Sequence, residues 1–211
     1  MRLMSQKHGF AYAGRAARRT GAAPTRTEDG SFGMHSEFSS VIAAATRWLL
    51  AAYPANGGAL SRALAEAQAR QAAMVAAALR YPTAVDAALL GLLPPGGADR
   101  LDRVAGAGVL DEGAGDTEAG WRTWVDEVVV SWAACLLSDP GLAASAVTAL
   151  AATEHGPSLA GDALRLTGPG VHDRAAAALL RHPDLVAPIA DLHRAELTAL
   201  LTAEPLDSFP A

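Results

Sequence analysis

The chain has 211 residues and a net charge of −5 at neutral pH. Its 17 basic residues form no stripe along the sequence, which excludes the electrostatic footprint of a nucleic-acid-binding protein. Apolar segments are interrupted by Pro54, Pro94 and Asp139 before they reach the length of a membrane span, so no span is expected. Cys135 is the only cysteine, so no disulfide can form within the chain and a reducing, cytoplasmic setting is expected.

The first 33 residues differ in composition from the remainder of the chain. Arginines stand there among glycine, alanine, threonine and serine, with almost no large apolar side chain. Such a stretch cannot bury a core, so residues 1–33 are expected to be a disordered arm or an upstream extension of the true start. Residues 34–211 are expected to form one all-α domain.

Two long helices are predicted at the start of this domain. From Ser36 onward, apolar side chains recur at the spacing of a helix, and Pro54 ends the pattern. A second helix is predicted over residues 58–80, where Arg62, Glu66 and Arg70 face outward at salt-bridge spacing. Its predicted inward face consists of Leu60, Leu64, Ala67, Gln71, Met74, Val75 and Ala78.

A short helix and a loop follow. Thr83, with Asp86 three residues later, forms a variant capping box and predicts a helix that continues through Leu93. Residues 94–116 are rich in glycine and proline and are expected to form a flexible surface loop, with one helical turn at 101–104. The glycines of this loop complete no phosphate-binding motif, and its acidic residues miss the EF-hand spacing. Neither a nucleotide cofactor nor a metal ion is therefore expected.

Three of the four tryptophans, Trp121, Trp124 and Trp132, lie within twelve residues of one another. The helical spacing of the apolar residues from Trp121 to Leu136 predicts one continuous helix with a broad buried face, and Asp126 is expected to point away from that face. The tryptophans are interpreted as a core spine. The alternative is an aromatic wall beside an apolar ligand, with Gln71 as a polar group that orients it.

The remaining chain alternates helices with proline turns. Asp139 followed by Pro140 predicts a helix start, and that helix is expected to extend to about Glu154. Further helices are predicted at 158–166, 171–181 and 185–203. This gives about eight helices and no strand. The prolines are spaced irregularly, so a compact bundle and an irregular array of αα-hairpins both remain open.

The last predicted helix carries the one candidate pair for catalysis, His193 and Glu196. An imidazole and a carboxylate three residues apart can meet on a helix, where they could act as general base and orienting group. The alternative is a hydrogen-bonded polar pair at the edge of the core. No serine-nucleophile or di-iron motif accompanies the pair.

The sequence favours a non-catalytic interaction or accessory protein. It contains no catalytic or nucleotide motif, and its alanine- and leucine-rich helices can pack closely against a protein partner or a second copy. One alternative is a module that binds a small apolar molecule in a pocket lined by Trp121, Trp124 and Trp132, with Gln71 or His193 as the polar group. The other is an enzyme that uses His193 and Glu196.

Overall fold

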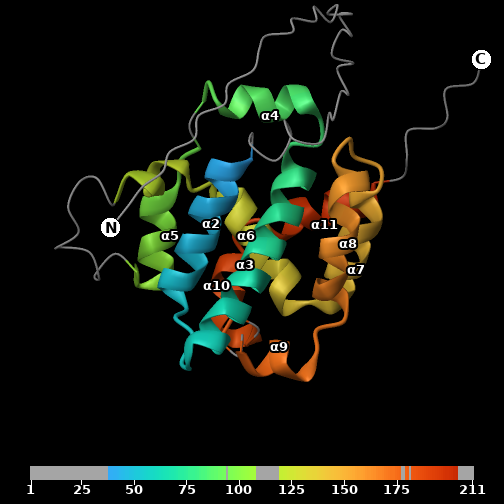
Figure 1. Cartoon of the computed structure of the whole chain (residues 1–211). Helices are drawn as coiled ribbons and strands as arrows, with labels where there is room; N and C mark the ends of the chain where they lie inside the picture. Colours follow the sequence, from blue (N-terminus) through green and yellow to red (C-terminus); the bar gives the residue numbers. More distant parts are fainter. Residues whose placement is uncertain (1–37, 94, 108–118, 177–178, 181, 204–211) are drawn as a thin grey trace, which may run out of the picture.

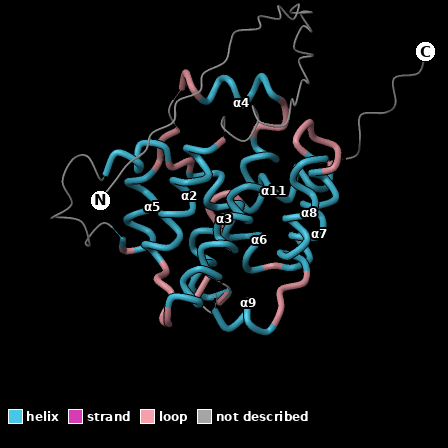
Figure 2. The backbone as a smooth tube through the Cα atoms, in the orientation of Figure 1, coloured by secondary structure: helices cyan, strands magenta, loops and turns pink. Residues whose placement is uncertain are grey.

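Helices make up the regular structure, and no strand occurs in the described part of the chain (Figure 2). The computed structural model describes residues 38–93, 95–107, 119–176, 179–180 and 182–203. The predicted arm at 1–33 and residues 94 and 108–116 of the predicted loop lie outside these residues. The helices are α2 (Ser39–Ala52), α3 (Ala59–Arg80), α4 (Ala84–Leu90), α5 (Ala98–Ala105), the 3₁₀ helix η2 (Ala119–Trp124), α6 (Glu127–Ser138), α7 (Pro140–Leu150), α8 (Gly156–Thr167), α9 (Val171–Ala176), α10 (Pro183–Ala190) and α11 (Arg194–Thr202).

The longest helix, α3, occupies the centre of the molecule. It packs against α2 and α6 along its length, and also contacts α7, α8 and α9 (Figure 1). On the far side of α6 lie α10 and α11, while α5 contacts α10. The all-α prediction is thus confirmed, and the arrangement around α3 is that of a compact bundle.

The buried face of α3 consists mainly of alanine. The predicted inward face is wrong at its start, because Leu60 is 72% exposed. The residues of α3 that are buried are Ala65, Gln68, Ala69, Ala72, Ala73, Val75, Ala76, Ala77, Ala78 and Leu79. Small side chains let neighbouring helices approach α3 closely, so the face that packs is the alanine face and most of the larger residues lie at its edges.

The tryptophan segment is two helices, so the prediction of one continuous helix is wrong. The 3₁₀ helix η2 ends at Trp124, and α6 begins at Glu127. Between them, the carboxylate of Asp126 accepts hydrogen bonds from the backbone N–H groups of Val128 (2.9 Å) and Val129 (3.2 Å). Asp126 is buried, contrary to the expectation that it points away. An aspartate that caps the next helix competes with continuation of the previous one, which explains the break.

Where helix starts depend on local capping, the predictions hold. The reciprocal hydrogen bonds of the Thr83–Asp86 capping box are formed, although α4 already ends at Leu90. Asp139 caps α7 by accepting from the next two N–H groups beyond Pro140. The helical turn expected at 101–104 extends to the eight-residue helix α5.

The last predicted helix is broken between α10 and α11. The backbone N–H of His193 donates to Ser131 Oγ (3.0 Å), and that hydroxyl donates to the carbonyl of Ala190 (3.2 Å). A side chain of α6 therefore satisfies backbone groups on both sides of the break. The thiol of Cys135 also donates to the Ala190 carbonyl. The break thus depends on a tertiary contact that local sequence patterns do not reveal.

Among the described residues, no single helix is long and apolar enough to cross a membrane. The pair α3 and α4 reaches that length and hydropathy only when taken together, and its two members are bent by 109°. In this structure, α3 is the central helix of the bundle.

Candidate functional site

The three tryptophans proposed as a pocket wall pack as part of the core or at its edge. Trp132 is buried, and its indole N–H donates to the carbonyl of His193 (3.2 Å). Trp121 and Trp124 lie on η2 and are partly buried against the core. The cavities described below include none of these tryptophans. Gln71 lies on α3, and no hydrogen bond among the described residues connects it to them.

The structure brings His193 and Glu196 together and adds a third residue, Glu127. His193 lies at the start of α11, and its Nδ1 is 3.3 Å from Oε2 of Glu196. Its Nε2 is 3.7 Å from Oε1 of Glu127, in the first turn of α6. Arg100 Nη1 of α5 lies 3.2 Å from the same glutamate oxygen. We call these four residues the His193 cluster. Glu127 is far from His193 in the sequence, so spacing gave no signal for it.

The contacts of the His193 cluster join three helices, α5, α6 and α11. Both nitrogens of the imidazole face a carboxylate. Gly97, at the start of α5, has a φ of 113°, and a Cβ there would lie 2.9 Å from Glu127 Oε2. The glutamate is thus enclosed between α5 and α11. In the described part of the chain, no group of three His, Cys, Asp or Glu side chains is placed to hold a metal ion.

Asp102 is the centre of a second polar contact that the sequence did not reveal. It is buried on α5, where it accepts a hydrogen bond from the indole N–H of Trp48 (2.8 Å). Its other carboxylate oxygen pairs with Arg122 of η2 at 2.6 Å. A buried carboxylate is stable only when paired and hydrogen-bonded, and both requirements are met here. The contact joins α2, α5 and η2.

A third polar contact surrounds Tyr81, directly after α3. Its hydroxyl donates to Asp126, and its carbonyl oxygen lies 2.9 Å from Nε2 of His155. The buried imidazole of His155 packs edge-on against Phe38, with ring centroids 4.8 Å apart. Burial, followed by the hydrogen bond to Asp126, raises the pKa of the Tyr81 phenol well above its ordinary value. These contacts tie the end of α3 to the start of α6 and to the residue before α8.

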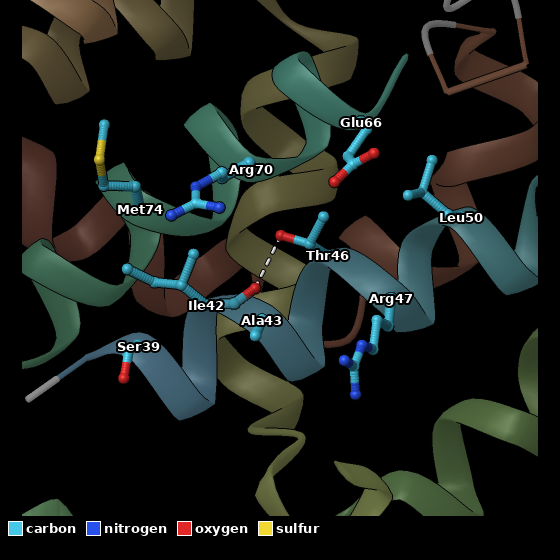
Figure 3. A pocket seen from close by; sticks show the side chains of 9 residues that line it. All are labelled: Ser39, Ile42, Ala43, Thr46, Arg47, Leu50, Glu66, Arg70 and Met74. Carbon is cyan, nitrogen blue, oxygen red and sulfur yellow. Dashed lines mark hydrogen bonds between the residues drawn. The ribbon is translucent and has the colours of Figure 1, made fainter. Parts of the chain in front are cut away.

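A groove with charged side chains lies between α2 and α3 (Figure 3). Its cavity volume is about 370 Å³. Glu66 and Arg70 extend from α3, and Arg47 extends from α2. Apolar side chains, including Ile42 and Met74, line the remainder. We call this feature the α2–α3 groove. Two other hollows, one beside Pro140 and Pro183 and one under α4, are lined mainly by apolar atoms.

The end of the molecule occupied by α4 exposes large aliphatic side chains. Val85, Leu89, Leu92 and Leu93 are 70%, 48%, 75% and 72% exposed. They lie on α4 and the turn directly after it, and Figure 1 shows α4 lying across one end of the bundle. We call these four residues the α4 surface. A hollow of about 260 Å³ adjoins it between Tyr81 and Leu93.

No protein-family model, curated protein or solved structure matches this chain. What each candidate site could bind is therefore inferred from the side chains that form it. The His193 cluster joins α5, α6 and α11 and leaves Arg100 and Glu196 exposed, the α2–α3 groove carries charged side chains, and the α4 surface is apolar.

Proposed function

We propose that this protein is a non-catalytic interaction module that pairs with a second copy of itself through the α4 surface. The observation that carries the proposal is the exposure of four large aliphatic side chains on α4 and the turn directly after it. Removing apolar area from water stabilises by about 25 cal/mol per Å², so such a surface is typical of a binding site.

Hydrogen bonds fix the start of α4, so the α4 surface is ordered before a partner binds. The Thr83–Asp86 capping box closes the first turn. Glu154, in the turn between α7 and α8, accepts a hydrogen bond from the N–H of Ala84 (2.8 Å) and donates its own N–H to the carbonyl of Pro82 (3.2 Å). Because the helix is already ordered, a partner does not have to meet the cost of forming it.

A second copy suits the α4 surface because the four side chains that form it are uncharged. None of its four side chains carries a charge, and the one carboxylate of α4, Asp86, is engaged in the capping box. Pairing about a twofold axis brings the same surface from each copy into contact, so a surface without charge meets no like charge. The surface is small, so we expect reversible pairing rather than an obligate dimer.

The mass of the full chain as a function of concentration tests this proposal. We expect light scattering to show a mass that rises from 21.6 kDa toward twice that value as the concentration increases. The double variant Leu92→Gln/Leu93→Gln should remain a monomer, because it replaces the two most exposed leucines of the α4 surface.

A matched control is Leu164→Gln, which replaces a 59% exposed leucine on α8. It should pair like the natural chain. A monomeric mass at every concentration, or a dimer that survives the double variant, would overturn the proposal.

A further inference from the structure

We propose that the α2–α3 groove binds a zwitterionic small molecule with an aliphatic body, of the size and chemistry of an aliphatic amino acid. The groove lies between two helices of the bundle, away from the four side chains of the α4 surface. This inference therefore does not depend on the pairing proposed above.

One part of the groove presents both signs of charge. Arg47, Glu66 and Arg70 all line it, and all three are exposed. Among the described residues, none of these three side chains forms an ion pair or a hydrogen bond. Glu66 and Arg70 are one turn apart on α3, a spacing at which opposite charges ordinarily pair. In Figure 3 the two side chains lie apart, and Arg47 extends away from both.

Glu66 determines the kind of head group that fits. A simple anion would be attracted by Arg70 but would also meet the unpaired carboxylate of Glu66. A molecule with an ammonium and a carboxylate on the same carbon atom can satisfy both side chains at once. Charge-assisted hydrogen bonds of this kind are the stronger ones, and two of them fix the orientation of the ligand.

The apolar lining accounts for the body of the ligand. Ile42 and Met74 are partly buried against the core and face the groove from opposite helices. Methionine adapts its shape to irregular apolar groups. The hydroxyl of Thr46 donates to the carbonyl of Ile42 (2.7 Å), so its proton is already engaged within α2. The volume of about 370 Å³ lies at the lower end of the range for small-molecule pockets, which suits an amino acid.

The test is a titration of the full chain with L-leucine, followed by NMR chemical shifts of backbone amides and methyl groups. We expect saturable shifts confined to residues of the α2–α3 groove. Two analogues separate the charges: 4-methylpentanoate lacks the ammonium, and 3-methylbutylamine lacks the carboxylate. Each should bind about tenfold more weakly, because each loses one charge-assisted hydrogen bond.

Two variants test whether Arg70 and Glu66 contact the ligand, and a third variant is the control. Arg70→Gln and Glu66→Gln should each weaken leucine binding about tenfold, whereas Arg103→Gln, at an exposed position on α5, should leave it unchanged. Absence of saturable shifts up to the solubility limit of leucine would overturn the proposal. Equal or tighter binding of 4-methylpentanoate, together with tighter binding by Glu66→Gln, would also overturn it by showing a site for simple anions.

Discussion

At the scale of single residues, Asp126 determines both a helix boundary and a tertiary contact. One carboxylate oxygen caps α6 through the N–H groups of Val128 and Val129, and the other accepts the hydroxyl of Tyr81. The first bond sets where the tryptophan segment breaks. The second ties the end of α3 to the start of α6.

Replacement of Asp126 should destabilise the fold strongly. Asp126→Ala removes a helix cap worth about 1 kcal/mol and leaves the part-buried Tyr81 hydroxyl without its acceptor, which costs about 1–3 kcal/mol more. We therefore expect a loss of about 2–4 kcal/mol in the free energy of unfolding, measured in urea. Asp126→Asn keeps a capping oxygen and should lose less. Equal stability of the two variants would contradict this role.

Stability should also fall in alkaline solution. Burial raises the pKa of the Cys135 thiol from its ordinary value of 9.0 to about 11. The unfolded thiol therefore ionises first, so its contribution to stability is fully present below pH 9 and is lost as the pH rises toward 11. The raised pKa of Tyr81 acts in the same direction above pH 10.

The measurement is the free energy of unfolding of the natural chain and of Cys135→Ala between pH 9 and pH 11. The natural chain should lose stability with the steeper slope, because only it carries the buried thiol. Parallel slopes would show that Cys135 does not contribute.

At the scale of elements, α3 shows how small side chains define a packing face. Ala65, Ala69, Ala72 and Ala76 are buried on the side that neighbouring helices cover. Sequence patterns placed the inward face by its larger residues and so assigned Leu60 wrongly. Alanine is common on both faces of this helix, so hydrophobic periodicity alone could not decide which face the bundle buries.

Enlarging the alanine face of α3 should destabilise the bundle. Ala72→Leu adds a branched side chain where Ala72 is fully buried, and overpacking of this kind costs about 1–3 kcal/mol. Thermal unfolding measures the loss. The matched variant Ala63→Leu, at an exposed position of the same helix, should leave the melting temperature nearly unchanged. Equal effects at the two positions would contradict the assigned face.

Helix boundaries were predictable where local chemistry decides them, as at Thr83 and Asp139. They were not predictable where a distant side chain decides them, as at the α10–α11 break that Ser131 stabilises. The same holds for the candidate residues. Spacing predicted that His193 and Glu196 could meet, but Glu127 enters only through the packing of α6.

At the scale of the whole molecule, two solvent-exposed features lie outside the buried core that surrounds α3. The α4 surface and the α2–α3 groove lie outside that core, on different elements (Figures 1 and 3). Sequence patterns predicted the helices that carry both features. They could not predict that, within the described residues, no helix covers the exposed side of α4, because that depends on how the bundle closes. The expectation of an interaction protein stays a prediction, now with a defined surface.

Cross-linking between two copies at α4 tests the central claim most directly. Ala88→Cys introduces an exposed thiol on α4, and the natural Cys135 is buried and cannot compete. Under mild oxidation we predict a covalent dimer of the full chain for Ala88→Cys, and little or none for Ala63→Cys on α3. No covalent dimer at Ala88, or equal yields at the two positions, would contradict pairing through α4.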